Sequence, residues 1–186
     1  FAASARGEAV TGRVYVAISR VNDRQTPIRQ AGPTGTPLFS LPVEQLAPGA
    51  EVRFSPAVEG HPVATLADLP PGEYWVQSFV NVHTRFPRAD GHTVWLHMDQ
   101  WEGQNWRTSP GNLYGDPVKV TGNPAAGTPI RLVADKVIPP ITPPADTEYV
   151  KRFRIQSDIL TKWWGHPIFL GATVLLPRGY DTHPDV

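Results

Sequence analysis

Cysteine is absent from the 186 residues of this chain. Its absence excludes a disulfide framework, a zinc site with thiolate ligands and a cysteine nucleophile. A long hydrophobic run is missing too. The most apolar stretch, residues 168–176, has the length of a strand, whereas a membrane-spanning helix needs about 20 residues. We therefore expect no membrane-spanning segment.

An excess of charge of one sign is also lacking. Lysine and arginine together number 17, as do aspartate and glutamate, so the formal net charge is zero. Proteins that bind nucleic acid or anionic lipid through their charge carry a surplus of basic side chains. The balance thus predicts neither nucleic acid nor a membrane as partner, and we expect no cofactor.

Glycine and proline are frequent instead, with 16 and 21 copies, and they predict many turns. Between the turns, apolar and polar residues alternate as in strands with one buried face. In residues 74–82, for example, Tyr74, Val76 and Val80 share one face and Phe79 lies on the other. The predicted strands are residues 12–20, 38–39, 52–54, 74–82, 93–97, 117–121 and 129–134. Short strands without a clear amphipathic helix predict a mainly β fold, with a Greek-key-type β-sandwich over residues 1–136.

A proline-rich segment interrupts this pattern. Residues 137–145 hold four prolines, which is typical of an extended connector, so we predict a linker over residues 137–147. The apolar residues of 146–164 fit both a helix and a strand. Residues 167–177 are apolar on both faces, as in a strand covered from both sides, and such a strand needs more protein than this chain supplies.

The stretch Lys162-Trp-Trp-Gly-His-Pro-Ile-Phe-Leu-Gly-Ala-Thr-Val-Leu-Leu-Pro-Arg-Gly-Tyr-Asp181 resembles the start of the catalytic domain in esterases of the enterochelin-esterase and feruloyl-esterase type. In that α/β-hydrolase family two strands form a first antiparallel hairpin, and the second ends in a Leu-Pro-x-Gly-Tyr-Asp motif. Residues 92–114 are similar to part of the N-terminal β-sandwich of one bacterial branch. The resemblance covers residues 65–186. It implies that residues 148–186 form the first hairpin of a hydrolase domain, and it favours a strand over residues 150–157.

By this resemblance the chain is the N-terminal segment of a secreted or periplasmic serine esterase that hydrolyses a small ester or a carbohydrate ester. The remainder of the hydrolase would pack on residues 148–186 and supply the serine, the acid and the histidine. The opening Phe1-Ala-Ala-Ser-Ala5 is typical of the end of a signal peptide or of a tail left by its cleavage, which also favours export.

The chain departs from the family by stopping at Val186, before any catalytic residue. Cleavage in the exposed loop 181–186, or a truncated sequence, would explain this end. An alternative from a different class is a stand-alone carbohydrate-binding β-sandwich with no associated enzyme.

Residues that could carry chemistry are few. An α/β-hydrolase places its serine in a Gly-x-Ser-x-Gly turn, and no serine here has that context. Ser109 precedes Pro-Gly-Asn and indicates an ordinary turn, so we predict no catalytic residue. His92, His97 and Asp99 could approach one metal ion, but their spacing matches no metal motif, and no metal site is predicted. Asp99 and Glu102 could suggest glycosidase chemistry, yet a solvated loop explains them better.

Tryptophan is concentrated in one segment. Trp95, Trp101 and Trp106 lie within twelve residues, beside Asp99 and Gln104. Indole rings provide flat apolar surfaces with a polar edge, and a few carboxylates and amides fix a ligand's orientation. We therefore predict a substrate-binding site formed by Trp101, Trp106, Asp99 and Gln104. The alternative is a purely packing role, in which Trp95 fills the core and the other two tryptophans brace a long loop.

Overall fold

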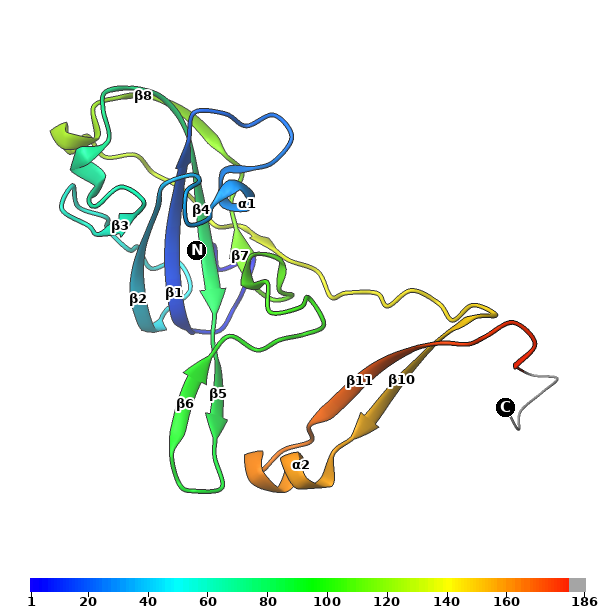
Figure 1. Ribbon diagram of the computed structural model, residues 1–186. Helices are drawn as coiled ribbons and strands as arrows, with labels where there is room; N and C mark the ends of the chain where they lie inside the picture. Colours follow the sequence, from blue (N-terminus) through cyan, green and yellow to red (C-terminus); the bar gives the residue numbers. More distant parts are fainter. Residues whose placement is uncertain (181–186) are drawn as a thin grey trace. The chain divides into compact units, whose positions relative to one another are not determined.

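A computed structural model describes residues 1–180 of the chain (Figure 1). It confirms the prediction of a mainly β protein with a large antiparallel sheet. The residues divide into two compact units. The first unit comprises Phe1–Thr84 and Trp95–Ile141, and the second comprises Arg85–Val94 together with the chain from Thr142 onward.

Within residues 1–180, seven strands of the first unit form a single antiparallel sheet in the order β3-β2-β1-β4-β7-β9, with β8 also paired to β4. Strand β4 is central because it pairs with β1 along one edge and with both β8 and β7 along the other. The strands of this sheet are β1 (Val10–Ser19), β2 (Leu38–Leu46), β3 (Gly60–His61), β4 (Gly72–Val82), β7 (Leu113–Tyr114), β8 (Val118–Gly122) and β9 (Lys136–Val137). Four short helical turns, α1 (Pro27–Gln30), η1 (Leu66–Asp68), η2 (Trp106–Thr108) and η3 (Pro124–Ala126), lie in the connections.

The alternation seen in the sequence places apolar side chains on both faces of β1 and β4. Val14 pairs with Val80 and Ile18 with Val76, and all four are buried on one face. Phe79 is buried on the opposite face with Ala17 and Ile28. Because both faces are covered, residues 76–81 of β4 are buried without interruption, so this strand forms the middle of the core.

The expected second sheet of a sandwich is not formed by the described residues. The predicted strands at residues 52–54 and 129–134 were wrong, since both segments are extended but belong to no β-ladder. Their apolar side chains still cover the sheet: Phe54, Leu132 and Ala134 all pack into its core clusters. Burial follows the apolar pattern only in part, because Ile130 and Val133 are 51% and 47% exposed, and the strand hydrogen bonds that the pattern predicted are not formed.

Strand β2 is longer than the two residues predicted for it. It runs through Pro42, which pairs with Arg13 of β1. Proline lacks an N–H, so it is confined to edge positions of a sheet. The far edge of β2 pairs with β3 only at Leu38 and Phe39, which leaves Pro42 at such a position.

The second unit contains a two-stranded hairpin, β10 (Val150–Gln156) and β11 (Phe169–Leu175), joined through α2 (Asp158–Trp164). Both patterns that fitted residues 146–164 are therefore present, first as a strand and then as a helix. The helix begins after Ser157, whose side chain accepts the Leu160 N–H, and it ends at Gly165, whose φ of 71° suits glycine. Asp181, the last residue of the esterase-like motif, and the predicted loop that follows it lie outside the described residues.

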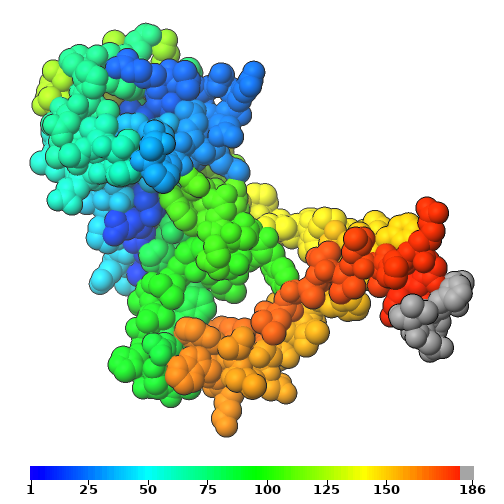
Figure 2. Space-filling model, viewed as in Figure 1, coloured from blue at the N-terminus to red at the C-terminus, as the bar shows by residue number. Residues whose placement is uncertain are grey.

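The second unit also includes the tip of another hairpin, formed by β5 (Thr84–Pro87) and β6 (Thr93–Leu96). The Phe86 ring packs edge-on against Trp164 at 5.7 Å, and the guanidinium of Arg88 lies 5.4 Å from the Trp163 ring. The Ala89 N–H donates to the Trp163 carbonyl at 2.7 Å. In Figure 2 the orange atoms of α2 lie directly against the green atoms of this tip.

Candidate functional site

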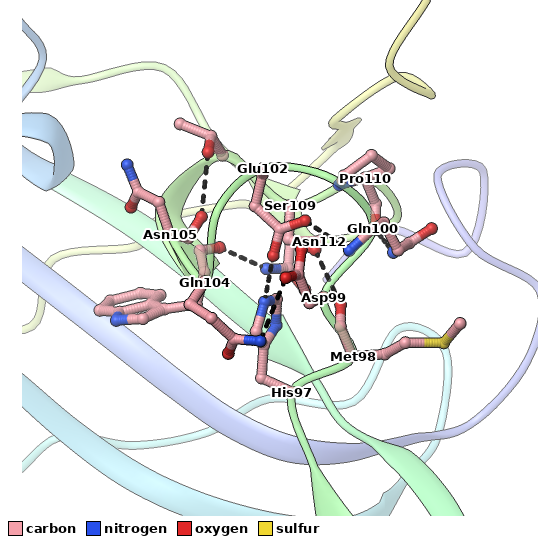
Figure 3. Close-up of polar contacts among 12 residues, drawn as sticks. His97, Met98, Asp99, Gln100, Glu102, Gln104, Asn105, Ser109, Pro110 and Asn112 are labelled. Atoms are coloured by element: carbon pink, nitrogen blue, oxygen red, sulfur yellow. Dashed lines mark hydrogen bonds and ion pairs between the residues drawn. The ribbon is translucent and has the colours of Figure 1, made fainter. Parts of the chain in front are cut away.

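The predicted binding residues lie in the loop between β6 and β7, residues 97–112 (Figure 3). Trp101 and Gln104 have φ values of 79° and 63° there, in the left-handed region that non-glycine residues rarely adopt. Asp99 accounts for this conformation. Its carboxylate accepts the Trp101 N–H at 2.9 Å and the Gln104 side-chain amide at 3.2 Å. The structure thus brings Asp99 and Gln104 together and ties Trp101 to them through its backbone.

The three tryptophans occupy different environments. Trp106 stacks on Tyr15 with 4.5 Å between ring centroids and meets Phe79 edge-on at 5.4 Å. It therefore packs against the sheet. Trp101 is 55% exposed and Trp95 is 41% exposed. The alternative in which Trp95 fills the core was wrong, because the residue that packs there is Trp106. Of the predicted set, Trp101, Asp99 and Gln104 reach solvent.

A histidine–carboxylate pair lies at the start of the same loop. His97 Nε2 is 2.5 Å from Glu102 Oε1, and the two side chains are only 14% and 1% exposed. Glu102 also accepts the Gln100 N–H at 2.6 Å. Burial disfavours the charge of this carboxylate, but the hydrogen bonds from Gln100 and His97 outweigh burial and hold the pKa of Glu102 below its ordinary value.

The sequence favours a solvated position for Glu102 and does not indicate its pairing with His97. A separation of five residues in a loop has no fixed geometry, so no sequence signal could have found the contact. His97 also influences His83, whose pKa is lowered by burial and by the neighbouring His97 and Arg13.

Two buried polar residues anchor the end of the loop. Asn112 is 2% exposed. It donates to the Trp106 carbonyl at 2.6 Å and to the Asn81 side chain at 3.2 Å, and it accepts the Val82 N–H at 2.8 Å. Ser109 is also 2% exposed and donates to the Met98 carbonyl at 3.4 Å. A buried serine that hydrogen-bonds the backbone of its own loop is a structural residue.

The histidines that might have shared a metal ion with Asp99 have separate partners. His92 lies 3.3 Å from Asp90, and His97 is paired with Glu102. Among residues 1–180, no group of three or more histidine, aspartate or glutamate side chains is placed to hold a metal ion. In the same part of the chain, no helix is long and apolar enough to cross a membrane.

The loop is therefore a hydrogen-bonded structure in which Asp99 contacts the Gln104 amide (Figure 3) and the backbone of Trp101, whose indole is exposed. Such a surface can bind a polar ring by stacking and hydrogen bonding. Comparison with protein-family models, with curated proteins and with solved structures found no match to this chain.

Proposed function

We propose that this chain is the N-terminal part of an exported serine esterase of the α/β-hydrolase type. In this proposal residues 1–136 form an accessory β domain and residues 148–186 begin the catalytic domain. The serine, acid and histidine come from the rest of the gene product, and the substrate is a small ester or a carbohydrate ester.

The observation that carries the proposal is the apolar face of the β10–β11 hairpin. In its register Ile155 lies opposite Leu170, and Phe153 lies opposite Ala172, so these four side chains share one face. Phe153, Ile155 and Leu170 are 51%, 62% and 53% exposed. A two-stranded hairpin alone is marginally stable, and a contiguous apolar patch of this kind marks a surface that other protein covers.

The opposite face of the hairpin carries both polar and apolar side chains. Such a mixture is expected of a surface that stays partly exposed to solvent at the start of a larger sheet. This face carries Arg152 opposite Thr173, and Arg154, whose guanidinium lies 4.0 Å from the Phe169 ring. The resemblance of residues 149–186 to the first hairpin of esterases supports the proposal that the covering protein is the sheet of a hydrolase.

The test uses the full-length product of the gene that encodes this chain. We expect a fluorophosphonate probe to label one serine outside residues 1–186, and the labelled protein to lose its hydrolysis of p-nitrophenyl acetate. Failure of both labelling and hydrolysis in a folded full-length protein would contradict the proposal.

Two substitutions connect the hairpin to that activity. Ala172→Asp places a charge on the apolar face and is expected to abolish hydrolysis by disrupting the catalytic domain. Thr173→Asp places the same charge on the opposite face, beside Arg152, and is expected to retain it. If both variants retain full hydrolysis, the apolar face is not covered by the hydrolase.

A second candidate function rests on the exposed indole of Trp101 beside Asp99 and Gln104. In this candidate the loop binds a carbohydrate, with or without an attached enzyme. Trp101→Ala should then abolish retention on an insoluble polysaccharide while leaving the melting temperature unchanged. Retention equal to that of the unaltered chain would reject it. Trp106→Ala is unsuitable for this test because Trp106 packs against the sheet.

A further inference from the structure

The first unit contains a large cavity between its sheet and the segments that cover it. The cavity has a volume of about 870 Å³. Val14, Val16 and Ile18 of β1 and Val76 and Val80 of β4 line its sheet side. The opposite wall is formed by residues 49–56 and 127–134, the two extended segments that belong to no β-ladder. Ligand sites in proteins measure about 300–1,000 Å³ and are mostly apolar, so both the size and the lining suit a small molecule.

One buried polar side chain on the sheet side has no partner. Ser78 lies between Val76 and Val80 on β4, on the same face, and it is 8% exposed. Its Oγ has no hydrogen-bond partner among the described residues, although its backbone carbonyl accepts the Gly115 N–H at 3.1 Å. Buried hydroxyl groups in proteins are nearly always paired, and an unpaired one requires an explanation. A ligand in the cavity that Ser78 lines would provide the missing partner.

The other polar groups of the cavity are either engaged or exposed at its rim. The Tyr74 hydroxyl donates to the Pro70 carbonyl at 2.5 Å and accepts from Arg20 at 3.1 Å. At the rim, the exposed Arg131 and Glu51 pair with each other at 3.3 Å. Among its buried groups, the sheet side therefore offers a ligand one unpaired hydroxyl, that of Ser78, and no charge.

We propose that this cavity binds a neutral, mainly apolar small molecule that carries a single hydroxyl or carbonyl group, and that Ser78 forms the hydrogen bond to that group. A serine hydroxyl both donates and accepts, so either group is a suitable partner. A charged ligand is disfavoured because the buried walls hold no opposite charge to offset the loss of its hydration. Every residue in this inference belongs to the first unit, so it does not depend on the proposed esterase activity.

The experiment compares two fluorescent probes on the 186-residue chain. Naphthalene has no polar group, whereas 1-naphthol has the same ring system with one hydroxyl. We expect both probes to bind saturably, and Ser78→Ala to weaken the binding of 1-naphthol about tenfold, as expected for the loss of one buried hydrogen bond, while the affinity for naphthalene is unchanged. An equal effect on both probes, or no saturable binding of either, would overturn the proposal.

A matched pair of variants locates the site. Val120 and Val118 lie two residues apart on β8, but only Val120 lines the cavity, while Val118 is 41% exposed. Val120→Phe should weaken both probes at least tenfold by filling the cavity, and Val118→Phe should leave them unchanged. If both variants bind as the unaltered chain does, the probes bind elsewhere, for example on the exposed hairpin, and the proposal fails. If Val120→Phe does not fold, the comparison of the two probes on Ser78→Ala decides alone.

Discussion

Two tryptophans of one loop differ in what they contribute, although they lie five residues apart. Trp106 stacks on Tyr15 and meets Phe79, and Trp101 is more than half exposed. We expect Trp106→Ala to lower the free energy of unfolding by about 3–5 kcal/mol, the range for removing a packed tryptophan. Trp101→Ala should change it by less than about 0.5 kcal/mol. Urea denaturation of both variants measures the difference, and equal losses would contradict the packing described for Trp106.

Glu102 makes stability depend on pH in the acid range. Its folded pKa is held below the unfolded value, so its ionised form stabilises the fold above the unfolded pKa of about 4.3. This stabilisation is lost as the pH falls from there through the folded pKa. Glu102→Gln removes the charge and should destabilise the chain by about 1–3 kcal/mol at neutral pH, with a smaller difference at low pH. Thermal melts across the acid range give the measurement, and a difference that grows on acidification would be the wrong sign.

The sequence predicted the location of the candidate site better than its contacts. The clustering of tryptophans with Asp99 and Gln104 is visible in the sequence, and the structure does bring these two polar side chains together. Which indole packs depends on where Tyr15 and Phe79 lie, and that follows from the register of β1 with β4. Register is a property of two strands far apart in the chain, so no local pattern could have assigned Trp106 to the core.

The covering segment approaches the sheet so closely at one position that only glycine fits there. Gly115 lies just after β7, and a Cβ added there would collide with the Val133 carbonyl and lie 2.8 Å from Ser78 Oγ. Gly115→Ala should therefore force the covering segment away from β4 and destabilise the first unit by about 1–3 kcal/mol. Gly122→Ala is the control, since a Cβ at Gly122 meets no atom within 4 Å. Chemical denaturation compares the two, and equal stability would show that the covering segment moves at little cost.

The elements that the sequence predicted well are those with strict alternation. Residues 12–20 and 74–82 became β1 and β4 as predicted, but the alternation indicated one buried face, whereas both faces of β4 are buried. The segments 52–54 and 129–134 have apolar residues too, but a ladder needs a neighbouring strand in register. These two segments, which are flanked by prolines and glycines, are extended and pack over the sheet without pairing to it. For β2 the prediction was too short. Pro42 indicated an early end to the strand, but the strand continues through it because an edge position tolerates proline.

The exposed apolar face of β10 and β11 is expected to control how the chain behaves in solution. We expect the isolated 186-residue chain to self-associate as its concentration rises, because Phe153, Ile155 and Leu170 are exposed on one side. Ala172→Asp should shift it towards the monomer, and Thr173→Asp should have little effect. Sedimentation velocity measures this. A chain that remains monomeric at all concentrations, with residues 150–175 protected from hydrogen exchange, would show that the hairpin needs no covering protein.

The division of the second unit into two stretches of sequence also has a consequence for biosynthesis. The tip residues Arg85–Val94 leave the ribosome first, and their aromatic partners on α2 follow about 75 residues later, a delay of roughly 4–15 s at about 5–20 residues per second. All strands of the first unit are made within that interval or before it. The contact between Phe86 and Trp164 can therefore form only after the strands of the first unit have been synthesised and can pair with one another.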